Sequence, residues 1–181
     1  MSVLLIGRGF EAAWGVALLL KKGGFQVDVI TSSLVMWPYS CIRKLTFVLP
    51  REPLYLFVRE ALKSQYDWIV VTEDGSLQEL CRAPLSLDEK LKCLPVKREE
   101  NLYHLYSKIG LSEVFQKQGV STPPFKVARN EEEVFLAAAE LGYPVFVKVD
   151  ASGGGAGIFE CTTPEDIKLI RKEVFKEPVL V

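Results

Sequence analysis

The sequence is poor in residues that bind metals or form disulfides. It has 181 residues with one histidine, His104, and four scattered cysteines that include no C-x-x-C pair: Cys41, Cys81, Cys93 and Cys161. A zinc site needs several such ligands at close spacing, which argues against one here. We therefore expect free thiols in a reducing cytosol, and a structural role for His104.

The chain also lacks an excess of charge of one sign and a long apolar run. It has 22 Lys and Arg against 23 Asp and Glu, a net charge of −1, and no basic run that would predict nucleic-acid binding. No apolar stretch is long enough to span a bilayer. The first seven residues lack the charged segment of a signal peptide and are typical of a first strand. We expect a cytoplasmic protein whose partners are small molecules, with neither nucleic acid nor membrane among them.

The first predicted strand, residues 2–6, leads into a glycine turn. The turn reads Gly7-Arg8-Gly9-Phe10-Glu11-Ala12, and an apolar helix to residue 22 and a strand over 25–30 follow. This G-x-G-x-x-A pattern is close to the dinucleotide fingerprint, which also expects an acidic residue at the end of the second strand, where this chain has Ile-Thr-Ser. Two interpretations stay open. The glycines let the helix pack on the sheet, or the turn holds a carboxylate or phosphate with Arg8 assisting.

Strands and helices alternate as far as residue 96. Strands are expected over 45–49 and 68–72, an edge strand over 93–96, and helices over 52–63, 76–82 and 87–91. This pattern predicts an α/β fold whose first domain, residues 1–97, is Rossmann-like, parallel and three-layered. Glu73 and Asp74 follow a strand at its carboxyl end, where open sheets contact ligands. With Gly7, Arg8, Gly9 and Phe10 they are candidate substrate-binding residues, and a solvated acidic turn is the alternative.

A charged stretch over 97–101 marks the predicted boundary to a smaller α+β domain, residues 98–181. A helical segment carrying Lys108 runs to about residue 118, and a rigid Ser-Thr-Pro-Pro connector and a strand over 125–128 follow. Asn130 begins a helix with a capping-box pattern. A strand over 143–150 precedes a glycine loop, a helix over 164–172 and a last strand from residue 177. The sequence ends inside that strand, as a cut through a larger fold would.

The strand over 143–150 and its loop carry the strongest chemical signal. Alternation puts Val145, Val147 and Val149 on one face and Lys148, a lone ammonium group, on the other. The following Ser152-Gly153-Gly154-Gly155-Ala156-Gly157 segment allows several backbone amides to point at one anion. No P-loop lysine follows the glycines, and the chain resumes as a strand, so the loop joins two strands. A lysine before an amide-rich loop is suited to a polyphosphate, whereas an edge-strand lysine beside a mobile hairpin is the alternative.

The order of these signals resembles the N-terminal part of an ATP-grasp enzyme. A Rossmann-like unit precedes a lysine-bearing helix, then "QGVSTPPF", a helix, "LGYPVFVKVD" and a glycine-rich hairpin. The family includes carbamoyl phosphate synthetase, biotin carboxylase and carboxylate–amine ligases. The resemblance implies a preATP-grasp domain and a first ATP-grasp lobe. It also implies that the nucleotide is bound by Lys108, Lys148, Ser152, Gly153, Gly154, Gly155 and Gly157.

The resemblance further implies ATP and Mg²⁺ as cofactors and small-molecule carboxylate and amine substrates. ATP would convert a carboxylate to an acylphosphate, which an amine or thiol then attacks. The metal ligands and other catalytic groups of the family follow the point at which this sequence stops, so no catalytic or metal residue is assigned here. We expect these residues alone to be inactive, and a homodimer is compatible with the resemblance.

Two other classes of function stay open at this stage. The Gly7–Ala12 turn is also suited to a nucleotide- or dinucleotide-binding module without ligase chemistry. Alternatively, the chain is a non-catalytic interaction protein, a degenerate ATP-grasp relative. That alternative requires a partner over the apolar surface where a second lobe would dock.

Overall fold

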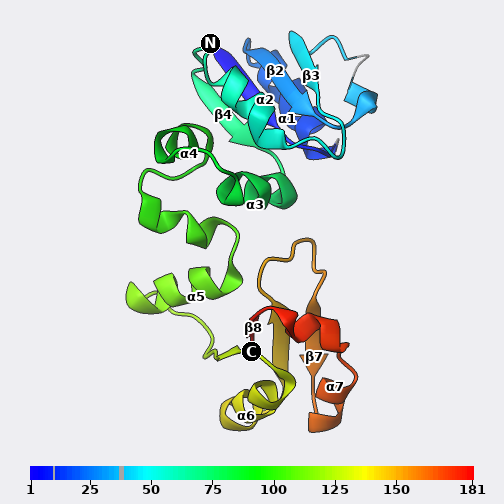
Figure 1. Ribbon diagram of the computed structural model, residues 1–181, viewed down its shortest axis with the longest axis vertical. Coiled ribbons are helices and arrows are strands. Elements are labelled where there is room, and N and C mark those ends of the chain that lie inside the picture. The colour runs from blue at the N-terminus through cyan, green and yellow to red at the C-terminus, as the bar shows by residue number, and fades with distance from the viewer. Residues whose placement is uncertain (10, 37–38) are drawn as a thin grey trace. The chain divides into compact units, whose positions relative to one another are not determined.

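A computed structural model describes residues 1–9, 11–36 and 39–181, which fall into two compact units, Met1–Leu102 and Tyr103–Val181 (Figure 1). The sequence placed the boundary slightly earlier, within 97–101. Within the described residues, no helix has the length and apolar character that crossing a bilayer requires.

The first unit is built on a parallel sheet with strand order β3-β2-β1-β4. Its strands are β1 (Ser2–Ile6), β2 (Gln26–Thr31), β3 (Lys44–Phe47) and β4 (Trp68–Val71). The central strand β1 is apolar along its length, and its residues Val3 to Ile6 are fully buried. Such continuous apolar runs are typical of parallel strands covered on both faces.

Helices connect and cover these strands. They are α1 (Glu11–Lys22), α2 (Leu54–Ala61), α3 (Asp74–Arg82) and α4 (Leu87–Cys93), with 3₁₀ turns η1 (Leu34–Met36) and η2 (Glu99–Asn101). Small residues on α1, Ala13 and Ala17, are buried against Val3, Leu5 and Val27 of the sheet. Close helix–sheet packing therefore depends on the absence of large side chains on that face of α1.

The second unit has an antiparallel sheet with strand order β5-β8-β6-β7. Its elements are η3 (Tyr103–Leu105), α5 (Lys108–Lys117), β5 (Val127–Ala128), α6 (Glu131–Leu141), β6 (Val145–Val149), β7 (Ile158–Cys161), α7 (Pro164–Lys168), η4 (Lys172–Lys176) and β8 (Val179–Leu180). Val145 and Val147 point into a core shared with α6 and α7. The mixed α/β character and the parallel first sheet agree with the predicted fold class.

Two helix starts in the second unit follow the capping rules that the sequence displays. The side chain of Asn130 accepts a hydrogen bond from the amide of Glu133, and Thr163 and Asp166 form a capping box at α7. The four cysteines are free and buried, as expected. Burial raises the pKa of the Cys93 thiol to about 12, so this thiol is protonated and unreactive at neutral pH.

Two predicted elements are wrong. Residues 93–96 are not an edge strand, because the helix predicted over 87–91 continues through the buried Cys93. The segment before residue 118 is not one long helix. It contains two 3₁₀ turns, and α5 begins only after Ser107, whose hydroxyl accepts from the amide of Gly110 at 2.8 Å. The second error arises from the Ser107 cap, a local signal that the periodicity of apolar residues does not contain.

Candidate functional site

The glycine turn after β1 meets the turn after β4 through a carboxylate. Glu73 Oε1 accepts from the amide of Arg8 at 2.7 Å and from the hydroxyl of Ser76 at 2.6 Å, and Oε2 accepts from the amide of Gly9 at 2.9 Å. A Cβ on Gly9 would lie 2.5 Å from Glu73 Oε2, so a larger residue would push this carboxylate away from the amides. The structure therefore brings Glu73 to Gly7–Gly9, and it fills the amides of this turn with a carboxylate of the chain itself.

Arg8 is held by its neighbours in the first unit. Its guanidinium donates two hydrogen bonds to Glu79, of 2.8 and 2.9 Å, and others to the hydroxyl of Ser32 and the carbonyl of Glu52. The hydrogen bond to Glu79 raises the pKa of Arg8, and the same bond lowers the pKa of Glu79. This geometry does not support the expectation that Arg8 assists a ligand, because its guanidinium links Glu79 of α3 to Ser32 and Glu52.

The other candidates of the first unit differ in their surroundings. Asp74 is exposed at the first turn of α3, where a negative charge is favourable to the helix dipole. This position fits the alternative of a solvated acidic residue. Phe10, the remaining candidate, lies outside the described residues.

Lys148 lies on the sheet face of the second unit opposite to the core. On β6, Val145 and Val147 are buried, whereas Phe146 is 46% exposed and Lys148 is half-buried on the same face as Phe146. The ammonium group of Lys148 lies 6.0 Å from the centroid of the Phe146 ring. The predicted alternation is confirmed, and it leaves a lysine on a partly apolar surface.

Lys148 and Phe146 line a pocket of about 300 Å³. The connector before β5, the end of α6 and the end of β8 form its other walls. The lining residues are Ser112, Thr122, Pro123, Pro124, Phe125, Leu141, Gly142, Pro144, Val145, Phe146, Lys148, Leu180 and Val181. Sequence reasoning missed this pocket, because its walls come from segments that are distant in the sequence. Its one local signal was the proline pair of the connector.

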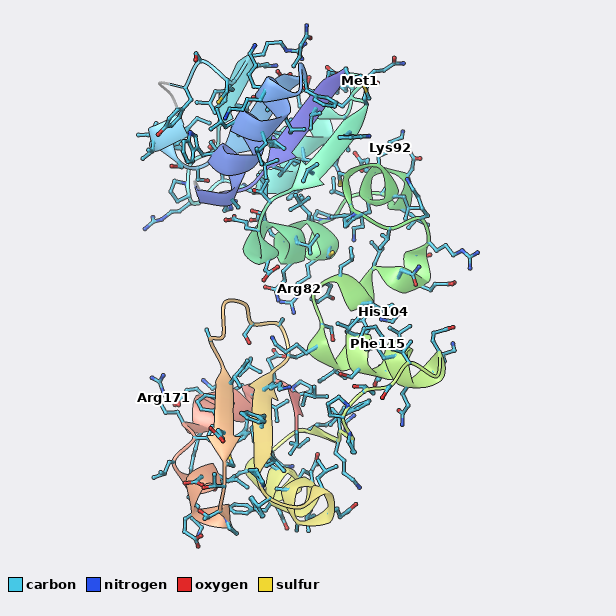
Figure 2. The ribbon with its side chains drawn as sticks, turned by 180° about the vertical axis from the view of Figure 1, so that it is seen from behind. Met1, Arg82, Lys92, His104, Phe115 and Arg171 are labelled. Atoms are coloured by element: carbon cyan, nitrogen blue, oxygen red, sulfur yellow. The ribbon has the colours of Figure 1, made fainter. Side chains whose placement is uncertain are left out.

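The loop between β6 and β7 has a root, where Val149 and Gly157 pair, and an exposed tip, Gly153 to Ala156. The amide of Val149 donates to the carbonyl of Gly157 at 2.8 Å, which closes the root. Gly154 and Gly155 have positive φ values of 60° and 78°, and Gly153 to Ala156 are exposed. Among the described residues, none accepts a hydrogen bond from the amides of Gly153, Gly154 or Gly155. Figure 2 shows how bare of side chains this loop is.

Lys108, the first residue of α5, reaches the root of the loop. Its ammonium group donates to the carbonyls of Val149 and Asp150 at 3.1 and 3.0 Å and to the hydroxyl of Ser152 at 3.0 Å, and it also contacts the Ser152 carbonyl. The structure thus brings together two predicted site residues, Lys108 and Ser152, at the end of the strand that carries Lys148. Sequence reasoning missed Asp150, whose carboxylate binds the start of α5.

No cluster of three or more His, Cys, Asp or Glu that could hold a metal ion occurs among the described residues. The second unit presents ammonium groups and backbone amides beside a partly apolar pocket, an arrangement that is suited to anion binding.

Comparisons with known proteins match this unit most specifically. The family model described as "Carbamoyl-phosphate synthase L chain, ATP binding domain" matches residues 108–179. The carbamoyl phosphate synthase large chain of Neisseria meningitidis serogroup B is 24% identical over 186 residues, which cover 97% of this chain and 17% of the relative.

Solved structures match the fold of nearly the whole chain. The N5-carboxyaminoimidazole synthetase of Staphylococcus aureus in complex with ADP has a TM-score of 0.73 at 19% identity, over 99% of this chain and 46% of that chain. The biotin carboxylase domain of the Hydrogenobacter thermophilus 2-oxoglutarate carboxylase has a TM-score of 0.69 at 22% identity. The match covers 99% of this chain and 43% of that chain. The chain thus spans less than half of these proteins, and identities this low show the fold alone.

Proposed function

From the confirmed resemblance of this chain to ATP-grasp enzymes, we propose that it is part of an ATP-dependent carboxylate–amine (or thiol) ligase and binds the ATP phosphates. The first domain, residues 1–97, is then the Rossmann-like preATP-grasp domain. Its parallel strand order β3-β2-β1-β4 supports this assignment. Residues 98–181 form the first ATP-grasp lobe. The whole ligase would extend beyond this chain, in keeping with the length of the relatives.

One observation carries the proposal: a half-buried lysine lies on β6, and a loop of open amides follows the end of that strand. Lys148 lines a pocket with apolar walls, and the Gly153–Gly155 amides lack acceptors among the described residues. A cation beside apolar surface favours a ligand with an anionic and an apolar part. ATP has both, so we assign its base to the pocket and its phosphates to Lys148 and the loop.

ATP supplies the phosphoryl group that activates a substrate carboxylate as an acylphosphate. The residues of this chain bind and orient it. Lys148 and Lys108 offset phosphate charge, and the loop amides donate to phosphate oxygens. The tip of the loop has the conformational freedom to close over them. The described residues do not provide a site for Mg²⁺, and we assign no step to the metal here.

Substrate binding by the first unit is a narrower proposal. Glu73 and Asp74 lie at the carboxyl end of β4, at the sheet edge where open α/β sheets bind ligands. Because Glu73 already fills the amides of Arg8 and Gly9, a substrate carboxylate or phosphate at Gly7–Gly9 must displace it. We assign Arg8 a structural role, since Glu79 holds its guanidinium.

The direct test is nucleotide binding by this chain, measured by calorimetry with a non-hydrolysable ATP analogue and MgCl₂. Lys148→Met should weaken binding by roughly 10- to 100-fold, because it removes charge-assisted hydrogen bonds to phosphate. Lys126→Met is the matched control. It removes a surface lysine of the same unit that pairs with Glu140. An unchanged dissociation constant for Lys148→Met, or an equal loss for Lys126→Met, would overturn the assignment of the phosphate site.

Titration with NADH tests the alternative of a dinucleotide-binding module. NADH binding that survives Lys148→Ala and is lost in Gly9→Asp would favour that alternative. We expect no such binding, because Glu73 occupies the amides that a pyrophosphate would need. We also expect no turnover by this chain alone with Mg-ATP and candidate carboxylates. Steady release of ADP would contradict that expectation.

A further inference from the structure

Asp150 directly follows the last residue of β6, and its carboxylate links this strand to the start of α5. Its Oδ1 accepts from the hydroxyl of Ser107 at 2.9 Å and from the amide of Ile109 at 2.8 Å. The Ser107 hydroxyl in turn accepts from the amide of Gly110 at 2.8 Å. A carboxylate at a helix N-terminus is favourable to the helix dipole as well as to the free amides. The bond links segments more than 40 residues apart, so it fixes tertiary structure and not only the helix.

Lys108 lies between the two residues that bind this carboxylate. While Ser107 and Ile109 contact the side chain of Asp150, the ammonium group of Lys108 donates to the carbonyls of Val149 and Asp150 and to the Ser152 hydroxyl. Contacts thus run in both directions between the start of α5 and the root of the β6–β7 loop. A free lysine side chain has many rotamers, and these contacts select one.

The surrounding packing makes the start of α5 hard to move by itself. Ser107 is 3% exposed, Ile109 4%, and a Cβ on Gly110 would lie 2.6 Å from the ring of Tyr103. Glycine at this position lets the Tyr103 ring lie directly on the helix backbone. A change at Asp150 therefore acts on a tight junction, and the hydrogen bonds of its carboxylate go to the start of α5.

We propose that Asp150 is a positioning residue, whose carboxylate fixes the start of α5 against the loop root and so sets where Lys108 lies for the nucleotide phosphates. This role rests on the proposed nucleotide site. It predicts an effect on nucleotide affinity that passes through Lys108, whereas a simple helix cap affects stability alone.

The chain offers a matched cap for comparison in the same unit. Asp166 accepts from the amides of Thr162 and Thr163, both at 2.8 Å, and from their hydroxyls, at the start of α7. It has no contact with Lys108 or the glycine loop. Asp166→Ala therefore removes a capping aspartate without touching the proposed junction.

The first measurement is hydrogen–deuterium exchange without nucleotide. Asp150→Ala should speed exchange at the start of α5 and at the loop root, whereas Asp166→Ala should leave both unchanged. Asp150→Asn keeps an oxygen acceptor for Ser107 and Ile109, so it should restore most of the protection. Unchanged exchange in Asp150→Ala would overturn the proposal, whatever the chain binds.

The second measurement is binding of the ATP analogue to single and double variants. Asp150→Ala should weaken binding on the order of 10-fold, and Asp150→Asn much less. The Asp150→Ala/Lys108→Ala double variant should bind no more weakly than Lys108→Ala alone. Full additivity, or equal losses in Asp166→Ala, would contradict a role through Lys108. Absence of binding by the unaltered chain would instead sink the proposed function, and with it the role of Asp150 toward a nucleotide.

Discussion

Two glycine-rich turns of this chain look alike in sequence and differ in what occupies them. Both follow a strand, β1 in the first unit and β6 in the second, and both can present backbone amides to an anion. In the first, the Glu73 carboxylate binds the amides of Arg8 and Gly9. In the second, the amides of Gly153–Gly155 have no acceptor among the described residues. A glycine turn therefore predicts an anion site only where the chain does not supply the anion.

The cations beside the two turns differ in the same way. Arg8 is paired with Glu79, which accepts from Nε and Nη2 along one edge of its guanidinium. The ammonium group of Lys108 donates hydrogen bonds to carbonyls and a hydroxyl of the second turn. Because a phosphate is a stronger acceptor for an ammonium group than a carbonyl is, a phosphate can replace these carbonyls at Lys108, whereas a ligand of Arg8 would have to displace the Glu79 carboxylate.

The largest effect is expected at the root of the second turn, from Gly157→Ala. Gly157 has a φ of 72°, and a Cβ there would lie 2.9 Å from Val149 Cβ. Left-handed strain of ~1–2 kcal/mol adds to an overpacking cost of ~1–3 kcal/mol. We expect the free energy of unfolding of the second unit to fall by the sum, about 2–5 kcal/mol, in urea titrations. A loss below that of Gly154→Ala would mean that the root is not rigid.

Glu73→Ala should have the next largest effect on stability, and it tests the binding of the Glu73 carboxylate to the amides of the first turn. It leaves the amides of Arg8 and Gly9 and the hydroxyl of Ser76 without their acceptor, which should cost ~1–3 kcal/mol of unfolding free energy in the first unit. The neighbouring exposed Asp74→Ala is the control and should change little. Added acetate should stabilise Glu73→Ala more than the unaltered chain. Equal effects of acetate would show that the vacated turn does not bind a carboxylate.

Gly154→Ala at the tip of the second turn should have a smaller effect on stability. Gly154 has a φ of 60°, but no atom lies within 4 Å of a Cβ built there. Strain alone is expected, about 1 kcal/mol, because an L-residue enters the left-handed region without a clash. Thermal unfolding of Gly154→Ala beside Gly157→Ala measures the contrast between tip and root. Equal destabilisation by the two substitutions would contradict it.

The smallest expected difference between the two units is in how much stability each loses at acidic pH. Hydrogen bonds from Arg59 lower the pKa of Glu89 to about 2, and those from Arg8 lower the pKa of Glu79. For Asp28, burial raises the pKa, but hydrogen bonds from Arg43 and Tyr66 outweigh it and the net pKa is lowered. A folded pKa below the unfolded one contributes stability at neutral pH that is lost as the pH falls. For Glu89 that window lies between roughly pH 4.5 and 2.

These lowered carboxylates lie in the first unit, whereas the second unit has Asp166 with a lowered pKa. The first unit should therefore lose more stability between neutral pH and pH 3. Hydrogen exchange of each unit across this range measures the difference. A second unit that is equally sensitive would contradict the expectation.

The sequence predicted local features of the candidate site well. Alternation placed Lys148 opposite Val145 and Val147, and the run of glycines located a loop between two strands. The caps at Asn130 and Thr163 gave helix starts. It failed at the end of α4, which continues to Cys93, and at the start of α5, where the Ser107 cap sets the boundary. Neither error touches the glycine loop, because strand and loop there are specified by adjacent residues.

The sequence by itself determined the elements, the faces of β6 and the positions at which the backbone can turn with positive φ. These properties depend on residues within a few positions of each other. Only the tertiary structure decided that Glu73 fills the first turn, that Glu79 holds Arg8 and that Lys108 and Asp150 meet the root of the second. Each of these contacts joins residues about 40 to 70 positions apart, and no local period encodes which distant side chain arrives.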